Sequence, residues 1–160
     1  MVIYVIRHGE TDWNTKHWLQ GTTDIPLNRN GIEVAEITSE ALKGIPFDVI
    51  FSSPLKRAYQ TAEIMKRERQ IPLIVDERLK EISFGCFEGL CCTGPNYNIP
   101  DPDFPNFFQN PAHYNPPEGG ESIAELCVRG TDFLTWLIDQ PEYQDKTVLI
   151  SAHGAIVKAL

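Results

Sequence analysis

VIYVIRHGE at residues 2–10 decides the fold class, because it joins five mostly apolar residues directly to the charged pair Arg7 and His8. A run that is hydrophobic without alternation is typical of a strand buried on both faces of a parallel sheet. Similar β-rich runs follow at 48–52 (DVIFS), 73–75 (LIV) and 147–151 (TVLIS). Since helical patterns separate these runs, the sequence predicts an α/β fold: a three-layer α/β/α sandwich with a mainly parallel sheet.

Three helices are predicted between the strands, over about 31–42, over 54–69 and over 123–138. The second has Ser53 as its candidate N-cap and Pro54 at the first helical position, and it must stop before Pro72. The third begins with Ser122 and has Glu125 three positions on, which is the pattern of a capping box.

Length and charge restrict the class of protein. The chain has 160 residues, which predicts a single domain over 1–160. It has 14 Lys and Arg against 22 Asp and Glu, a net charge of −8, which argues against a nucleic-acid partner because such a partner needs a broad basic face. No apolar run is long enough to cross a bilayer, and the run at 2–6 is too short for the core of a signal peptide, so we expect no membrane partner. Four cysteines without metal-site spacing indicate reduced thiols and a cytoplasmic location.

Residues 93–118 contain seven of the twelve prolines, together with several aromatic residues. So long a connection in a compact domain is usually a lid or a binding loop and less often a disordered linker. The aromatic residues favour an ordered lid or specificity loop.

Basic side chains follow three of the predicted strands. Arg7 and His8 come after the first strand, Arg57 lies one turn into the helix after the second, and His153 with Gly154 follows the last. Ligands of open parallel sheets bind at this edge. Arginine matches phosphoryl oxygens with two donors, and a neutral histidine offers a nucleophilic ring nitrogen. The residues therefore predict a phosphate pocket in which the second histidine, if protonated, stabilises the transferring phosphoryl group.

A general acid is also needed to protonate the leaving alcohol. Glu81 is the best candidate, because it follows a probable strand and precedes the glycine-punctuated run FGCFEG at 84–89. Glu88 lies in the same loop and remains an alternative. His17 and His113 are expected to be solvated loop residues.

The motifs at the strand ends resemble those of the histidine phosphatase superfamily, the phosphoglycerate mutase-like fold. RHGETDWN (7–14), SSPLKRAYQTAEI (52–64), LKEISFGCFEG (79–89), GGES (119–122) and SAHGA (151–155) follow in the family's order and spacing. The resemblance implies that His8 is the phosphorylated nucleophile and Glu81 the proton donor. It assigns the phosphate pocket to Arg7, Arg57 and His153, and contacts to phosphate or leaving group to Asn14, Gly21, Thr22 and Gly154. It implies no metal and no cofactor.

Within that family, hydrolysis is favoured over a mutase reaction primed by a bisphosphate. EISFGCFEG is similar to the phosphatase branch, and no Lys or Arg occurs between Glu81 and Val128, where a mutase would hold a carboxylate and a second phosphate. We expect a phosphomonoester hydrolase for a small metabolite with an apolar or ring-containing body, or with broad tolerance. The alternatives are a cofactor-dependent phosphoglycerate mutase and a catalytically weak binding protein.

The chain ends seven residues after His153, so C-terminal elements of the resembled fold are expected to be missing. Their absence would expose apolar surface, and we therefore expect self-association, for example as a homodimer.

Overall fold

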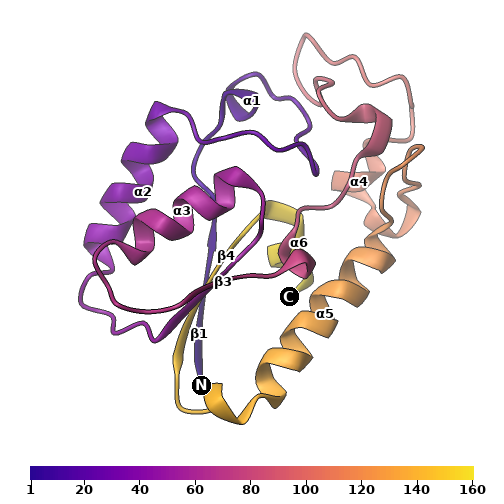
Figure 1. The fold of residues 1–160 in the computed structure, drawn as a ribbon. Coiled ribbons are helices and arrows are strands. Elements are labelled where there is room, and N and C mark those ends of the chain that lie inside the picture. The colour runs from indigo at the N-terminus through magenta and orange to yellow at the C-terminus, as the bar shows by residue number, and fades with distance from the viewer.

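The computed structural model describes residues 1–160, and its centre is a sheet of four parallel strands (Figure 1). The strands are β1 (Val2–Arg7), β2 (Val49–Ser52), β3 (Leu73–Val75) and β4 (Thr147–Ala152), in the spatial order β1-β4-β2-β3. All four predicted strands are confirmed, with ends within one residue. The register pairs Arg7 with Ala152 and Ser151 with Ser52, so the carboxyl ends of β1, β4 and β2 lie side by side.

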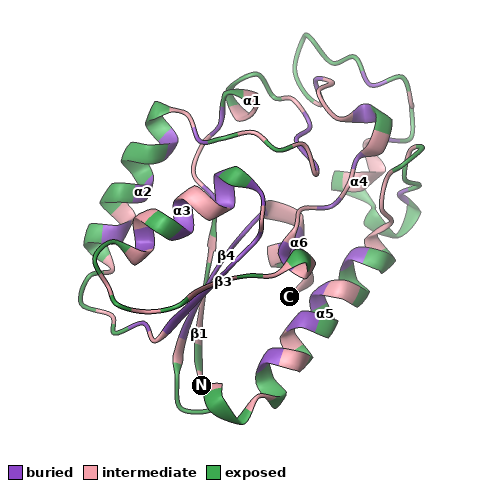
Figure 2. Ribbon diagram, in the orientation of Figure 1, coloured by how far each residue is buried: buried purple, intermediate pink, exposed green.

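Helices cover both faces of this sheet, which confirms the three-layer sandwich. On one face α2 (Arg29–Ala41) and α3 (Lys56–Lys66) pack on a core that includes Ile50 and Leu149. On the other face α5 (Ile123–Asp139) and α6 (Gly154–Ala159) pack on a larger core that includes Phe51 and Ile150. Figure 2 shows β2 and β4 buried between the two layers, whereas the edge strand β1 is partly exposed. None of the helices combines the length and the apolar character that a membrane crossing requires.

Short helices make up the remaining regular structure. The α-helical ones are α1 (Asp12–Thr15) and α4 (Asn106–Gln109); the 3₁₀ turns are η1 (Glu77–Leu79), η2 (Gly85–Phe87), η3 (Pro111–His113) and η4 (Pro141–Tyr143).

The predicted start of α3 is wrong by two residues. Its N-cap is Leu55, without a side-chain cap, and its first helical residue is Lys56. Ser53 lies two residues before this N-cap; its hydroxyl accepts from the Leu55 amide at 3.3 Å and lies 2.8 Å from the Nε2 atom of His153. The predicted capping box of α5 is confirmed: the Ser122 hydroxyl accepts from the Glu125 amide at 3.2 Å, and the Glu125 carboxylate accepts from the Ser122 amide at 2.9 Å.

The proline-rich segment 93–118 folds back on the body of the domain. Phe104 and Tyr114 are buried in the larger core, and Phe107 packs against Phe104 and, at 4.9 Å between ring centroids, against Phe84. Such aromatic packing orders the segment. It therefore forms a wall beside the carboxyl edge of the sheet.

Candidate active site

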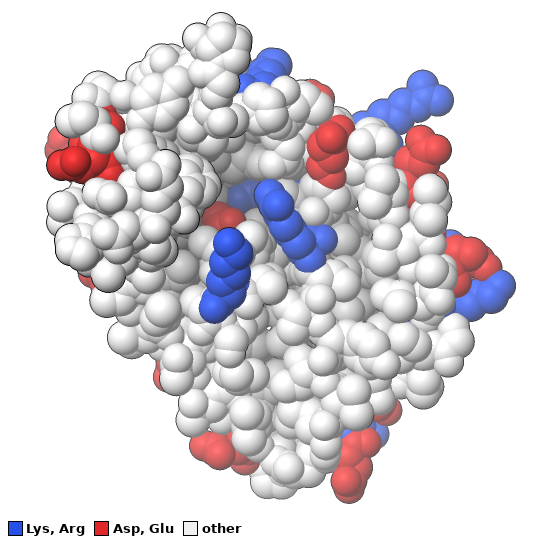
Figure 3. All heavy atoms as spheres, turned by 180° about the vertical axis from the view of Figure 1, so that it is seen from behind, with Lys and Arg blue, Asp and Glu red and all other residues white.

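A pocket of about 510 Å³ opens at the carboxyl edge of the sheet, between the body of the domain and segment 93–118. Figure 3 shows a hollow in this region from behind, with Lys and Arg side chains at its edge. Seven of the nine predicted site residues line the pocket: Arg7, His8, Asn14, Gly21, Arg57, Glu81 and Gly154. Thr22 and His153 are not in its wall.

His8 is nine-tenths buried and its tautomer follows from its partner. The Nδ1 atom lies 2.6 Å from the carbonyl oxygen of Gly9, which can only accept, so Nδ1 carries the proton. The neutral ring therefore keeps its lone pair on Nε2. Burial, with Arg57 and Arg7 nearby, lowers the pKa of His8 from 6.5 to about 3. The ring is thus neutral and able to act as a nucleophile across the physiological pH range.

His153 lies behind His8, fully buried, with 5.1 Å between the ring centroids. Burial, then Arg57 and His8, hold the pKa of His153 well below its usual value, so the ring is neutral at neutral pH. Its Nδ1 atom is buried without a partner. His153 does not line the pocket, and the role expected of it when protonated stays a prediction.

Arg57 is fully buried at the start of α3 and is held by the loop that follows α1. Its guanidinium donates to the carbonyl oxygens of Thr23 at 2.8 Å and Gly21 at 2.7 Å. Burial lowers the pKa of Arg57 to about 10, which leaves the side chain charged at neutral pH. The pocket thus has a fixed buried cation next to His8.

The two candidate acids occupy different places. Glu81 lines the pocket, and its carboxylate accepts from the backbone amides of Ala155 at 3.0 Å and Ile156 at 3.2 Å, at the start of α6. Glu88 lies outside the pocket wall, and its carboxylate accepts from the amides of Thr22 and Thr23, both at 2.9 Å. Of the two candidates only Glu81 lies in the pocket wall, whereas the hydrogen bonds of Glu88 hold the loop of Thr22 and Thr23.

The contacts of Glu88 also account for two features of the loop: Thr22 does not line the pocket, and residue 21 is glycine. The Thr22 hydroxyl donates to Glu88 as well, at 3.1 Å, so both donors of Thr22 are used. Gly21 has φ +50°, and a β-carbon there would lie 2.0 Å from the Glu88 carboxylate. The loop that holds Arg57 therefore depends on Glu88.

Asn14 lines the pocket from α1. The side-chain oxygen of Asn14 accepts from the backbone N–H of Thr11 at 3.0 Å, and the Thr11 hydroxyl accepts from the backbone N–H of Asn14 at 3.2 Å. These two bonds form a capping box that fixes the start of α1.

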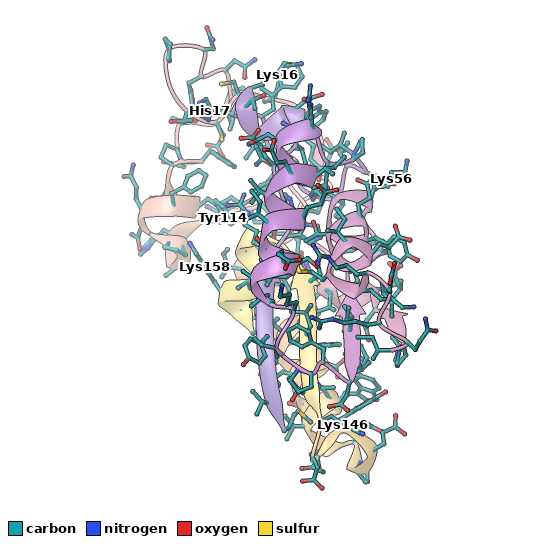
Figure 4. The ribbon with its side chains drawn as sticks, turned by 90° about the vertical axis from the view of Figure 1, so that its left-hand side faces the viewer. Lys16, His17, Lys56, Tyr114, Lys146 and Lys158 are labelled. Atoms are coloured by element: carbon teal, nitrogen blue, oxygen red, sulfur yellow. The ribbon has the colours of Figure 1, made fainter.

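Much of the remaining wall is apolar and includes Phe84, Phe107 and Phe108. The sequence reasoning missed Lys158, a third cation of the pocket beside Arg7 and Arg57; it extends from α6 on the side that faces α4 (Figure 4). The available signal was helical spacing, since Lys158 lies four residues after Gly154. His17 is exposed as expected, but it also lines the pocket.

Comparison with known proteins identifies the family. A sequence model described as "Histidine phosphatase superfamily (branch 1)" matches residues 3–160. The chain is 37% identical over 158 residues to the "Uncharacterized phosphatase PhoE" of Bacillus subtilis (strain 168), covering 99% of this chain and 74% of the relative. It is 32% identical over 164 residues to the "2,3-bisphosphoglycerate-dependent phosphoglycerate mutase" of Cytophaga hutchinsonii, covering 99% and 75%.

Among solved structures, "Bacillus stearothermophilus YhfR" superimposes with a TM-score of 0.89 at 36% identity, covering 99% of this chain and 76% of that one. The chain thus spans about three quarters of the length of the relatives that it matches.

Proposed function

The chain belongs to the histidine phosphatase superfamily, branch 1, and from this premise we propose that it hydrolyses phosphomonoesters through a phosphohistidine on His8. The observation that carries the proposal is the state of His8: a buried, neutral ring whose proton sits on Nδ1 and whose Nε2 lone pair is free. The Nε2 atom attacks phosphorus in line, the N–P bond forms, and the P–O bond to the leaving alcohol breaks.

Glu81 is the proposed acid and base. Its proton goes to the leaving oxygen in the first step. In the second step, a water molecule attacks phosphorus, its proton goes to Glu81, and the N–P bond breaks to release inorganic phosphate. His8 and Glu81 then return to their starting states. The position of Glu81 in the pocket wall with His8 supports these roles.

Arg7 and Arg57 are proposed to bind the phosphoryl oxygens, as permanently charged groups suited to paired contacts. His153 lies behind His8, and phosphate bound at the site would raise the pKa of His153, because a nearby anion favours the protonated ring. Asn14, Gly21 and Gly154 are proposed to contact the phosphate or the leaving group. Thr22 is proposed to act through its loop, since Glu88 uses both of its donors.

The proposed substrate is a small phosphomonoester with an apolar or ring-containing body, or a broad set of such esters. The aromatic wall formed by Phe84, Phe107 and Phe108 supports this proposal. We assign segment 93–118, which supplies two of these rings, as the specificity loop.

Among the relatives are a mutase and phosphatases, so the mutase reaction is the second candidate. Comparing the turnover of an aryl phosphate with that of 3-phosphoglycerate separates the two; a strong preference for the latter would favour the mutase.

The test of the proposed function is hydrolysis of an aryl phosphate in excess EDTA by the wild type and by His8→Ala. We expect turnover that persists in EDTA and is lost in the variant. Equal rates in both proteins would overturn the role of His8, and no turnover in either would favour a binding protein.

A cytoplasmic location and a homodimer are further proposals. The four cysteines are all free, which supports a reducing compartment. Val2 and Val5 on the edge strand β1 are 55% and 40% exposed, which supports self-association. Sedimentation equilibrium tests the second proposal, and a monomer at all concentrations would contradict it.

A further inference from the structure

Arg129, on α5, holds the backbone that carries Glu81. Its guanidinium donates from Nη1 to the carbonyl oxygens of Arg78 and Lys80, both at 2.7 Å, and from Nη2 to the carbonyl oxygen of Glu81 at 3.0 Å. Residues 80–83 have no regular secondary structure, so no ladder of a helix or a sheet fixes their carbonyl groups. Arg129 supplies the missing partners.

The same guanidinium makes a two-pronged ion pair with Glu121. Nε donates to one carboxylate oxygen at 2.6 Å and Nη2 to the other at 2.8 Å, and both side chains are about four-fifths buried. All five N–H groups of Arg129 therefore have an acceptor. A planar group with every donor used has one orientation, and it imposes that orientation on its partners.

Glu121 lies three residues after the end of segment 93–118, in a stretch that runs beside the loop after Glu81. The Glu121 amide donates to the Ser83 carbonyl at 2.9 Å, and the Cys86 amide donates to the Glu118 carbonyl at 3.0 Å. Arg129 thus joins α5 to the backbone of Glu81 and, through Glu121, to the residues that directly follow the proposed specificity loop.

We propose that Arg129 is a positioning residue for the proton transfer by Glu81, acting with Glu121; this inference rests on the proposed function. A general acid contributes on the order of 100- to 10,000-fold when its proton meets the leaving oxygen. A displacement of about 1 Å can cost on the order of 100-fold. Removing the Arg129 guanidinium is therefore expected to impair the protonation of the leaving group while the phosphate pocket stays in place.

Impaired protonation of the leaving group can be measured by comparing two substrates whose leaving groups differ in their need for a proton. 4-Nitrophenolate leaves as the anion without needing a proton, whereas the alkoxide from 2-phenylethyl phosphate must be protonated as it departs. Both substrates carry one ring for the apolar wall. Their kcat/KM values report only steps up to phosphorylation of His8, so they separate loss of the acid from a general loss of structure.

For Arg129→Gln we expect kcat/KM for 2-phenylethyl phosphate to fall about 10- to 100-fold, with the value for 4-nitrophenyl phosphate changed less than about threefold. Glu81→Gln should show the same selectivity with a larger fall, and the double variant should fall by less than the product of the single effects. Equal losses on both substrates in Arg129→Gln would overturn the proposal. If Glu81→Gln itself shows no selectivity, the proposed role of Glu81 fails instead.

The matched control is Arg78→Gln. Arg78 also joins this region to α5, donating to Asp132 at 2.8 Å, but its side chain makes no hydrogen bond to Glu81. Arg78→Gln should change kcat/KM for the two substrates by the same factor. A selective fall for 2-phenylethyl phosphate in this control would overturn the proposal. Glu121→Gln is the second variant if Arg129→Gln does not fold: it keeps the carbonyl contacts, and we expect the same selectivity at a smaller size.

Discussion

Acidification is expected to destabilise the folded protein through His8. The folded-state pKa is about 3 and the ordinary value is 6.5, so between these limits the unfolded chain binds a proton at His8 that the folded chain does not. The contribution of His8 to the free energy of unfolding is fully present above pH 6.5 and is lost as pH falls toward 3. Its full size is about 5 kcal/mol, and the part lost between pH 7.5 and 5.5 is about 1.4 kcal/mol.

The assay is urea unfolding at pH 7.5 and 5.5, with the wild type, His8→Asn, and His113→Asn as the control at an exposed site. Burial gives His153 a contribution of the same sign in all three proteins, so the comparison isolates His8. The free energy of unfolding should fall by about 1.4 kcal/mol more in the wild type and in His113→Asn than in His8→Asn. An identical pH dependence in wild type and His8→Asn would show that His8 is not held neutral by burial in the folded protein.

Three further substitutions test the site. Glu88→Gln should lower the free energy of unfolding by about 2 kcal/mol and reduce kcat/KM, because the carboxylate holds the loop of Thr22; unchanged urea midpoints and rates would contradict this. Phe107→Ala should raise KM for phenyl-bearing phosphates about fivefold, through loss of about 1 kcal/mol of apolar contact, with kcat little changed; steady-state kinetics with an unchanged KM would argue against the aromatic wall. Ser53→Ala should reduce kcat/KM about 3- to 10-fold, because His153 loses the partner of its Nε2 atom; activity equal to wild type would remove that role.

The sheet and the location of the site could be predicted from sequence because both are local properties. Buried parallel strands are continuous hydrophobic runs, and the residue after each run must lie at the carboxyl edge. On this basis the sequence predicts Arg7, His8 and Arg57 at one site, and the structure brings them together in the pocket.

Contacts between distant segments could not be predicted in this way. Glu88 holds Thr22 across 66 positions, and Arg129 holds the carbonyl of Glu81 across 48. No periodicity in the sequence encodes such pairs. The contact of the Ser53 hydroxyl with His153 is of the same kind, because it joins residues 100 positions apart.

Trapping of the phosphorylated protein tests the central claim most directly. An aryl phosphate is mixed with the enzyme, the reaction is quenched within one turnover in alkali, where phosphohistidine survives, and the modified residue is located by mass spectrometry. We expect phosphate on the Nε2 atom of His8 in the wild type, and none in His8→Ala. Turnover of the substrate with no phosphorylated His8 at any time, or with phosphate on another residue, would contradict it.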